Sequence, residues 1–273
     1  MCNNKQANFI YFGLIVTGEC EEKFLPSLFR SLMSCRLCRF EVVRRISQRD
    51  PITSKPRQLK MIGTGKTIPD RDQDEIGIPA RKYLSKEGKR FLLLVDDMER
   101  RRVENAPEVY KRYRSALDTM LESVSKANRA SVHFLMNMLE AYYFGDANAI
   151  NQVFGSSMTD YDGDVESIPH PKNELKEIQK GFDEVKHGQQ ICSKLDMNHV
   201  LSKRDTCAWF RTTFAWCILA LKKHNPHLTQ FDQSFSLEAG ILSIITGPQL
   251  KDLCERNPCL LYTSDAADEE DSV

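Results

Sequence analysis

The sequence predicts an α/β protein in which a parallel sheet is flanked by helices. Residues 8–16 (NFIYFGLIV) form a continuous apolar run rich in β-branched and aromatic side chains, which is typical of a strand buried on both faces. From 19 to 33 the apolar residues recur at three- and four-residue spacings and acids crowd the first turn, which indicates a helix. Alternation of this kind favours right-handed crossovers between parallel strands.

Further strand and helix candidates follow along the chain. Residues 40–46 (FEVVRRI) and 91–95 (FLLLV) predict two more strands, and the segment 68–84 leads into a helix between them. The later candidates are a helix at 107–123, a strand at 130–135, an aromatic-rich helix at 138–144, a loop at 155–165 and a buried helix at 207–221.

The chain divides into three parts by composition. Residues 1–150 hold the alternating strands and helices, and residues 151–258 predict a mostly helical extension of the same unit. Residues 259–273 begin with CLLYTSDAADE, which resembles a translated sequencing adapter, so we expect an artefact tail. That tail carries five acidic and no basic residues, which leaves 33 acidic against 38 basic residues in 1–258. The resulting excess of positive charge is compatible with binding a polyanion.

No segment predicts a membrane span or an export signal. The longest apolar stretch, Phe9 to Val16, is much shorter than the roughly 20 residues that cross a bilayer. The start, MCNNKQANF, lacks the apolar segment of a signal peptide. Nine cysteines scattered over 273 residues indicate free thiols. We therefore expect a cytoplasmic protein with no membrane partner.

Acidic residues follow two of the predicted strands. Glu19 and Glu21 come after the first strand, and Asp96, Asp97 and Glu99 come after residues 91–95. Because the carboxyl ends of parallel strands meet at one edge of a sheet, we expect these carboxylates to lie together. They would raise one another's pKa unless a cation with a preference for oxygen ligands, such as Mg²⁺ or Mn²⁺, neutralised them. The alternative is that they are ordinary first-turn residues of helices.

Five segments resemble an uncharacterised bacterial family of TOPRIM-like proteins, which is distantly similar to the overcoming-lysogenization-defect nucleases. The segments are, in order, GLIVTGECEEKFLPSLFRSL, FLLLVDDMERRR, FLMNMLEAYYFGD, PHPKNELK and VKHGQQICSKLDM. The resemblance implies a TOPRIM-like fold and a magnesium-dependent nuclease-type site acting on nucleic acid. Members of the family are encoded beside AAA-type ATPases, so the resemblance also implies an ATPase partner and a role in defence against phage.

The resemblance assigns roles to particular residues. Glu21 matches the second glutamate of the TOPRIM turn motif, and Asp96 matches the first aspartate of an Asp-x-Asp pair. With Asp97 beside them, they are the predicted catalytic residues and metal ligands, and Glu19 is a further predicted ligand. Glu99 is an additional candidate, because it follows the same strand.

Two positions depart from the family pattern. Thr17 stands where the leading glutamate is expected, and Met98 stands in place of the second aspartate. These departures favour an alternative function, in which a catalytically degraded TOPRIM scaffold serves as an interaction or effector module together with an ATPase.

Basic residues near the acidic ones predict contacts with a nucleic-acid backbone. Arg100 and Arg101 follow the second acidic group, and Lys172 lies in the segment PHPK. The alternative is that such charged runs are solvated faces.

Three further residues are candidates for the site. Glu140 lies in a segment of buried character, where a carboxylate requires a partner. The resemblance implies that it is a site residue, and the alternative is that it pairs with a buried arginine. His170 and His187 lie in family-like motifs that predict polar loops, where a histidine is either solvated or in contact with a phosphate or metal.

Overall fold

A computed structural model of the protein describes residues 7–49, 59–60, 67–68, 70–228 and 242–243. For residues 59–60, 67–68, Arg100 and Arg101 it describes the backbone alone, so the side chains of these two arginines lie outside the described part of the structure. Among the described residues, no helix combines the length and the apolar character needed to cross a bilayer.

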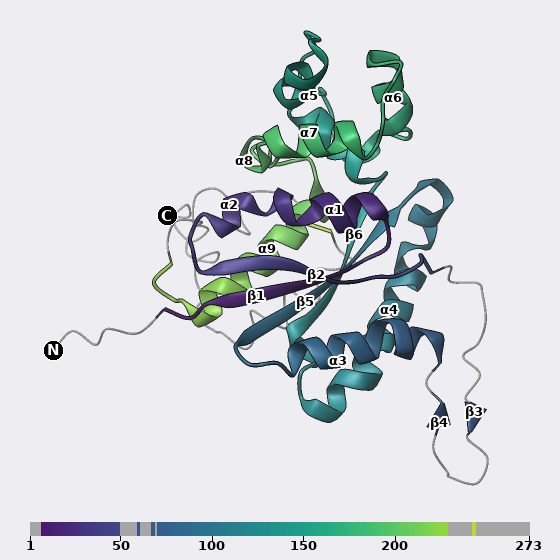
Figure 1. Ribbon diagram of the computed structural model, residues 1–273, viewed down its shortest axis with the longest axis vertical. Coiled ribbons are helices and arrows are strands. Elements are labelled where there is room, and N and C mark those ends of the chain that lie inside the picture. The colour runs from purple at the N-terminus through teal and green to yellow at the C-terminus, as the bar shows by residue number, and fades with distance from the viewer. Residues whose placement is uncertain (1–6, 50–58, 61–66, 69, 229–241, 244–273) are drawn as a thin grey trace, which may run out of the picture.

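The centre of the structure is a four-stranded sheet in which all strands are parallel (Figure 1). Its strands are β1 (Ile10–Val16), β2 (Cys38–Arg45), β5 (Lys89–Met98) and β6 (Ala130–Met136), in the order β2-β1-β5-β6. A separate antiparallel pair joins β3 (Leu59–Lys60) and β4 (Thr67–Ile68). The predicted α/β class with a helix-flanked parallel sheet is confirmed.

Helices cover both faces of this sheet. On one face, α1 (Glu19–Leu28), α2 (Arg30–Met33) and α9 (Ala208–His224) pack in one hydrophobic core. On the other face, α3 (Ile78–Leu84) and α4 (Ala106–Leu121) pack in a second core. Figure 1 shows α1 and α2 on one side of the strands and α3 and α4 on the other.

The two cores divide the side chains of β5 by strand alternation. Phe91, Leu93 and Val95 belong to the core under α1 and α9, whereas Leu92 and Leu94 belong to the core under α3 and α4. Successive residues of a strand point to opposite faces, so each core takes every second residue. This parity also decides where the polar residues at the end of β5 point.

A group of short helices extends the layer beyond α1. Helices α5 (Ala147–Phe154), α6 (Pro171–Ile178), α7 (Lys186–Lys194) and α8 (Met197–Val200) form this group, and α7 packs on both α1 and α5 (Figure 1). The remaining helices are the π-helix η1 (Gln73–Gly77) and the 3₁₀-helices η2 (Arg100–Asn105), η3 (Glu122–Val124), η4 (Ala127–Arg129), η5 (Leu139–Gly145) and η6 (Val165–Ser167).

Three elements differ from the sequence-based expectation. The helix expected over 19–33 is interrupted at Phe29, whose fully buried ring stacks on Phe40 with the ring centroids 4.1 Å apart. The segment expected as a helix at 138–144 is the 3₁₀-helix η5. Strand β5 continues to Met98 because β6 pairs with it that far, so the two aspartates lie within the strand rather than after it.

Trp216 of α9 provides a test of how strongly this helix is held on the sheet. Its side chain is buried and contacts the rings of Phe12 and Phe91, with centroid distances of 6.4 and 5.7 Å. We expect Trp216→Ala to lower the free energy of unfolding by about 3–5 kcal/mol, because it removes a large core side chain. Urea denaturation followed by circular dichroism measures this, with the exposed Val103→Ala as the control. Equal losses in the two variants would contradict the packing described.

Candidate functional site

A cavity of about 410 Å³ opens where β1 and β5 end. Five carboxylates line it, and Lys172 is the cation among the described lining residues. The five are Glu19, Glu21, Asp97, Glu99 and Glu184. The cavity is therefore strongly acidic, and ligands of parallel α/β sheets bind at this end of the strands.

Glu21 is fixed at the cavity by the turn that joins β1 to α1. It lies in the first turn of α1, where acidic side chains are favoured, and is 2% exposed. Its carboxylate folds back over Gly18 so closely that a Cβ at that position would lie 1.8 Å from Oε2. A side chain at position 18 would therefore displace the Glu21 carboxylate from this place. Burial raises the pKa of Glu21, and the charges of Asp96 and Glu99 raise it further.

Asp97 points into the cavity from β5. It is 7% exposed, and its Oδ1 accepts no hydrogen bond from any residue that the structure describes. Burial raises the pKa of Asp97 well above its ordinary value, and the carboxylates of Glu21 and Glu140 add to this effect. An unpartnered buried carboxylate oxygen is costly, and such groups concentrate at functional sites.

Glu140 lies beside the same cavity, on η5 directly after β6. It is 2% exposed, and its Oε1 accepts no hydrogen bond within the described residues. Burial raises its pKa to about 7, although the ammonium group of Lys172, 3.8 Å from Oε1, opposes this effect. Glu140 also forms a potential metal-binding group with Cys20 and Glu184, because one ligand atom of each lies within 4.8 Å of the others.

Lys172 is surrounded by these acids. Its Nζ lies 3.0 Å from Glu184 Oε2 as well as 3.8 Å from Glu140 Oε1. Burial lowers its pKa, but the neighbouring carboxylates raise it more, so that the net pKa lies above the ordinary value and the side chain stays charged. The structure therefore places the lysine predicted to contact nucleic acid inside the acidic cluster.

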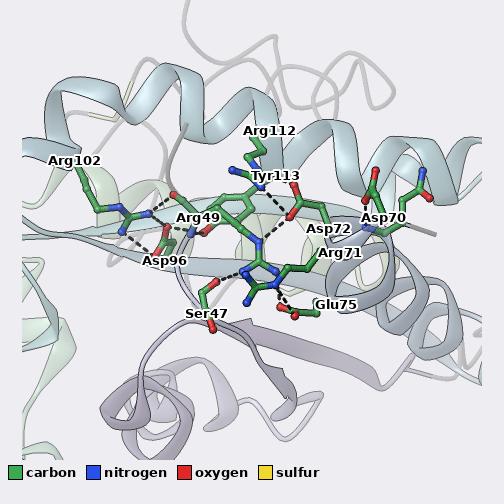
Figure 2. A network of polar contacts seen from close by, with 11 residues as sticks. Ser47, Arg49, Asp70, Arg71, Asp72, Glu75, Asp96, Arg102, Arg112 and Tyr113 are labelled. Atoms are coloured by element: carbon green, nitrogen blue, oxygen red, sulfur yellow. Dashed lines mark hydrogen bonds and ion pairs between the residues drawn. The ribbon is translucent and has the colours of Figure 1, made fainter. Parts of the chain in front are cut away.

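Asp96 points to the opposite face of the sheet from Asp97, toward the polar network that Figure 2 shows. It is fully buried and bonded to Thr17, Arg102 and Tyr113. Thr17 donates to Oδ1 over 2.7 Å and also accepts a bond from the Asp97 amide over 3.3 Å. The structure therefore does not bring the carboxylate of Asp96 together with those of Asp97 and Glu21 as free ligands of one metal site. A buried arginine thus pairs with Asp96, whereas the cation near Glu140 is Lys172.

The other predicted candidates occupy the edges of the site. Glu19 is an exposed residue bonded to Lys23 over 2.6 Å, and Glu99 lines the cavity. His170 is half-buried and precedes α6. His187 lies in the first turn of α7 rather than in a loop, and its Nδ1 accepts a bond from the Asp183 amide over 2.8 Å.

A second group of potential metal ligands lies on the helical extension. One ligand atom each of Asp146, Asp160 and His199 lies within 4.8 Å of the others. Asp160 already accepts a bond from the amide of Ala147 and contacts His199 Nε2 over 2.6 Å, and Asp146 accepts from the amide of Asp196. These bonds connect the segments around α5 and α8, which accounts for the cluster without an ion.

Several site residues have no signal in the sequence pattern. Glu184 approaches the cavity directly before α7, which packs against α1, and Arg102 and Tyr113 approach Asp96 from beyond β5. Comparison with family models, with curated proteins and with solved structures finds no match. The TOPRIM-like relationship therefore stays a prediction from the motifs.

The raised pKa of Glu140 predicts a pH dependence of stability. The folded pKa of about 7 lies above the ordinary value of 4.5, so the folded state binds this proton more tightly than the unfolded state does. The resulting stabilisation is fully present below pH 4.5 and is lost as the pH rises through about 7. We expect Glu140→Gln to gain stability relative to the unsubstituted protein as the pH rises, by roughly 3 kcal/mol at most.

Urea denaturation in the presence of EDTA, between about pH 5 and about pH 8, measures this difference. The exposed Glu108→Gln is the matched control, and its stability should run parallel to that of the unsubstituted protein. A difference between Glu140→Gln and the unsubstituted protein that stays constant over this range would show that the carboxyl group is not perturbed.

Proposed function

We propose that the protein is a TOPRIM-like, metal-dependent phosphodiesterase of the nuclease type, acting on nucleic acid in defence against phage. The observation that carries the proposal is the pair of buried carboxylate oxygens, Asp97 Oδ1 and Glu140 Oε1, that accept no hydrogen bond within the described residues. Asp97 lines an acidic cavity at the carboxyl ends of parallel strands, where α/β proteins bind ligands, and Glu140 lies 3.8 Å from Lys172 of the same cavity.

The residues at the cavity fit a divalent cation. Glu21, Asp97 and Glu140 are the ligands that we assign to it, because all three are buried and all three have a raised pKa. Carboxylate oxygens are the ligands that Mg²⁺ and Mn²⁺ prefer, and a cation would remove the repulsion among these groups. When bound, it would supply positive charge to phosphate oxygens and lower the pKa of a bound water.

Lys172 has a distinct role in this proposal. Because it pairs with Glu184 and approaches Glu140, it offsets part of the negative charge that would otherwise repel a phosphodiester. Its ammonium group is partly exposed, with 25% of the side chain accessible, so it can also donate to a phosphate oxygen.

The cavity volume of about 410 Å³ lies within the range of small-molecule sites.

A second function is favoured by a specific observation. Thr17 stands where the TOPRIM pattern has a glutamate, and its hydroxyl donates to Asp96, so one expected ligand is missing and the other is occupied. The alternative is a module without catalytic activity that keeps the scaffold and works with an AAA-type ATPase. In that case the acidic cavity would bind a cation or a basic segment of the partner without bond cleavage.

Cleavage assays distinguish the two functions. We expect the full chain to cut plasmid DNA, single-stranded DNA or transfer RNA with Mn²⁺ or Mg²⁺, and not with EDTA. Asp97→Asn and Glu140→Gln should each lower the rate by about 100-fold or more, because each removes a charged ligand. Glu108→Gln, an exposed carboxylate on α4, should leave the rate unchanged.

Two outcomes would contradict the proposed nuclease activity. One is cleavage that persists at the same rate in Asp97→Asn and Glu140→Gln, which would indicate a contaminating nuclease. The other is binding of Mn²⁺ without cleavage of any of the three substrates, with or without an AAA-type ATPase, which would support the module without catalytic activity.

A further inference from the structure

All acceptor positions of Asp96 are occupied by the protein itself. Oδ1 accepts from Thr17 Oγ1 over 2.7 Å and from Arg102 Nη1 over 3.3 Å. Oδ2 accepts from Arg102 Nη2 over 2.6 Å and from the Tyr113 hydroxyl over 2.8 Å. An ionised carboxylate offers about four lone-pair positions, and four donors fill them here. Asp96 thus has no acceptor position left for a metal ion.

The guanidinium group of Arg102 is held from several sides. In addition to Asp96, it donates to the carbonyl oxygen of Asp97 over 2.6 Å and to that of Arg49 over 2.9 Å. Tyr113, which bonds Asp96, also accepts from the Arg49 amide over 3.1 Å. Because an arginine in a protein stays protonated, a permanent positive charge is fixed beside the carboxyl end of β5.

A network of ion pairs anchors this arrangement at its far end (Figure 2). The side chain of Arg49 is bonded to Asp72 over 2.7 Å and to Glu75, and Arg112 is bonded to Asp72 over 2.6 Å. Arg49 is 3% exposed, so these bonds are shielded from solvent. Displacing Arg102 from Asp96 would therefore disturb contacts among the end of β2, the segment before α3, and α4.

Strand parity separates this fixed charge from the cavity. Asp96 has the parity of Leu92 and Leu94 and points toward α4, whereas Asp97 has the parity of Val95 and points toward α1. The two neighbouring aspartates of β5 thus lie in different electrostatic environments. One is neutralised by an arginine, and the other keeps an unpartnered oxygen at the cavity.

We propose that the cavity binds a single divalent cation and that Asp96 is not a ligand, because Arg102 already neutralises Asp96 on the opposite face of the sheet. Enzymes that cleave phosphodiesters often hold two metal ions about 3.5–4 Å apart, with carboxylates shared between them. Here the carboxylate that would hold the second ion is bound to Arg102. The inference rests on the proposed metal site and specifies how many ions it takes.

The number of bound ions tests this directly. We expect titration of the full chain with Mn²⁺, followed by electron paramagnetic resonance of the free ion and by calorimetry, to give one ion per chain. Two ions per chain with similar affinity would overturn the inference while leaving the proposed metal-dependent function intact. The absence of any Mn²⁺ binding would instead show that the proposed metal site itself is wrong, and the inference would fail with it.

Matched substitutions of the neighbouring aspartates give a second test. Asp97→Asn should weaken Mn²⁺ binding by about tenfold or more, whereas Asp96→Asn should change the affinity by no more than about threefold. Because Asp96→Asn leaves the charge of Arg102 without its partner, the double variant Asp96→Asn with Arg102→Gln, which removes both charges, is measured beside it. Loss of Mn²⁺ binding in the double variant, with a melting temperature close to that of Asp97→Asn, would identify Asp96 as a ligand and overturn the inference.

Discussion

The alternation of side chains along β5 is the constraint on which the organisation of the site depends. Asp96 and Asp97 are adjacent in the chain, yet the pleat of the strand directs one toward α4 and the other toward α1. Arg102 bonds the first, whereas the second shares a cavity with Glu21. An aspartate pair that reads as one acidic motif in the sequence is thus divided between two environments.

The two environments also differ in how they tolerate buried charge. A buried carboxylate is stable when a well-aligned partner and further hydrogen bonds satisfy it, as they do for Asp96. Asp97 and Glu140 each have a carboxylate oxygen without a hydrogen bond among the described residues. Burial raises the pKa of both, as it does that of Glu21. That arrangement costs stability in the isolated chain, and the packing of Phe12, Phe29 and Phe40 beneath the same face provides a hydrophobic core that offsets part of it.

The pattern of apolar residues in the sequence predicted the strands of the sheet well, because a parallel strand that is buried on both faces consists of a continuous apolar run. It also located Glu21 and Asp97 at one edge, since both lie near strand ends. The sequence did not predict that hydrogen bonds would occupy all acceptor positions of Asp96. Its partners Arg102 and Tyr113 reach it only through the path that the chain takes after β5. The opposite directions of the two aspartates were not predicted either, because the strand was expected to end at Val95 and the structure extends it to Met98. Glu184 carries no such signal, because tertiary packing of α7 brings it to the cavity.

The dispersal of the cavity residues along the chain has a consequence for folding. Thr17 and Asp97, whose amide donates to the Thr17 hydroxyl, are 80 residues apart, and Lys172 lies in the helical extension that follows the whole sheet. Closing such long loops makes these contacts slow to form, and a chain emerging from the ribosome exposes Glu21 and Asp97 well before Lys172 is available. While they are solvated, these carboxylates do not repel one another strongly. Much of the electrostatic penalty therefore arises when α6 and α7 dock and enclose the acids, so this docking is more sensitive to added cations than assembly of the sheet is.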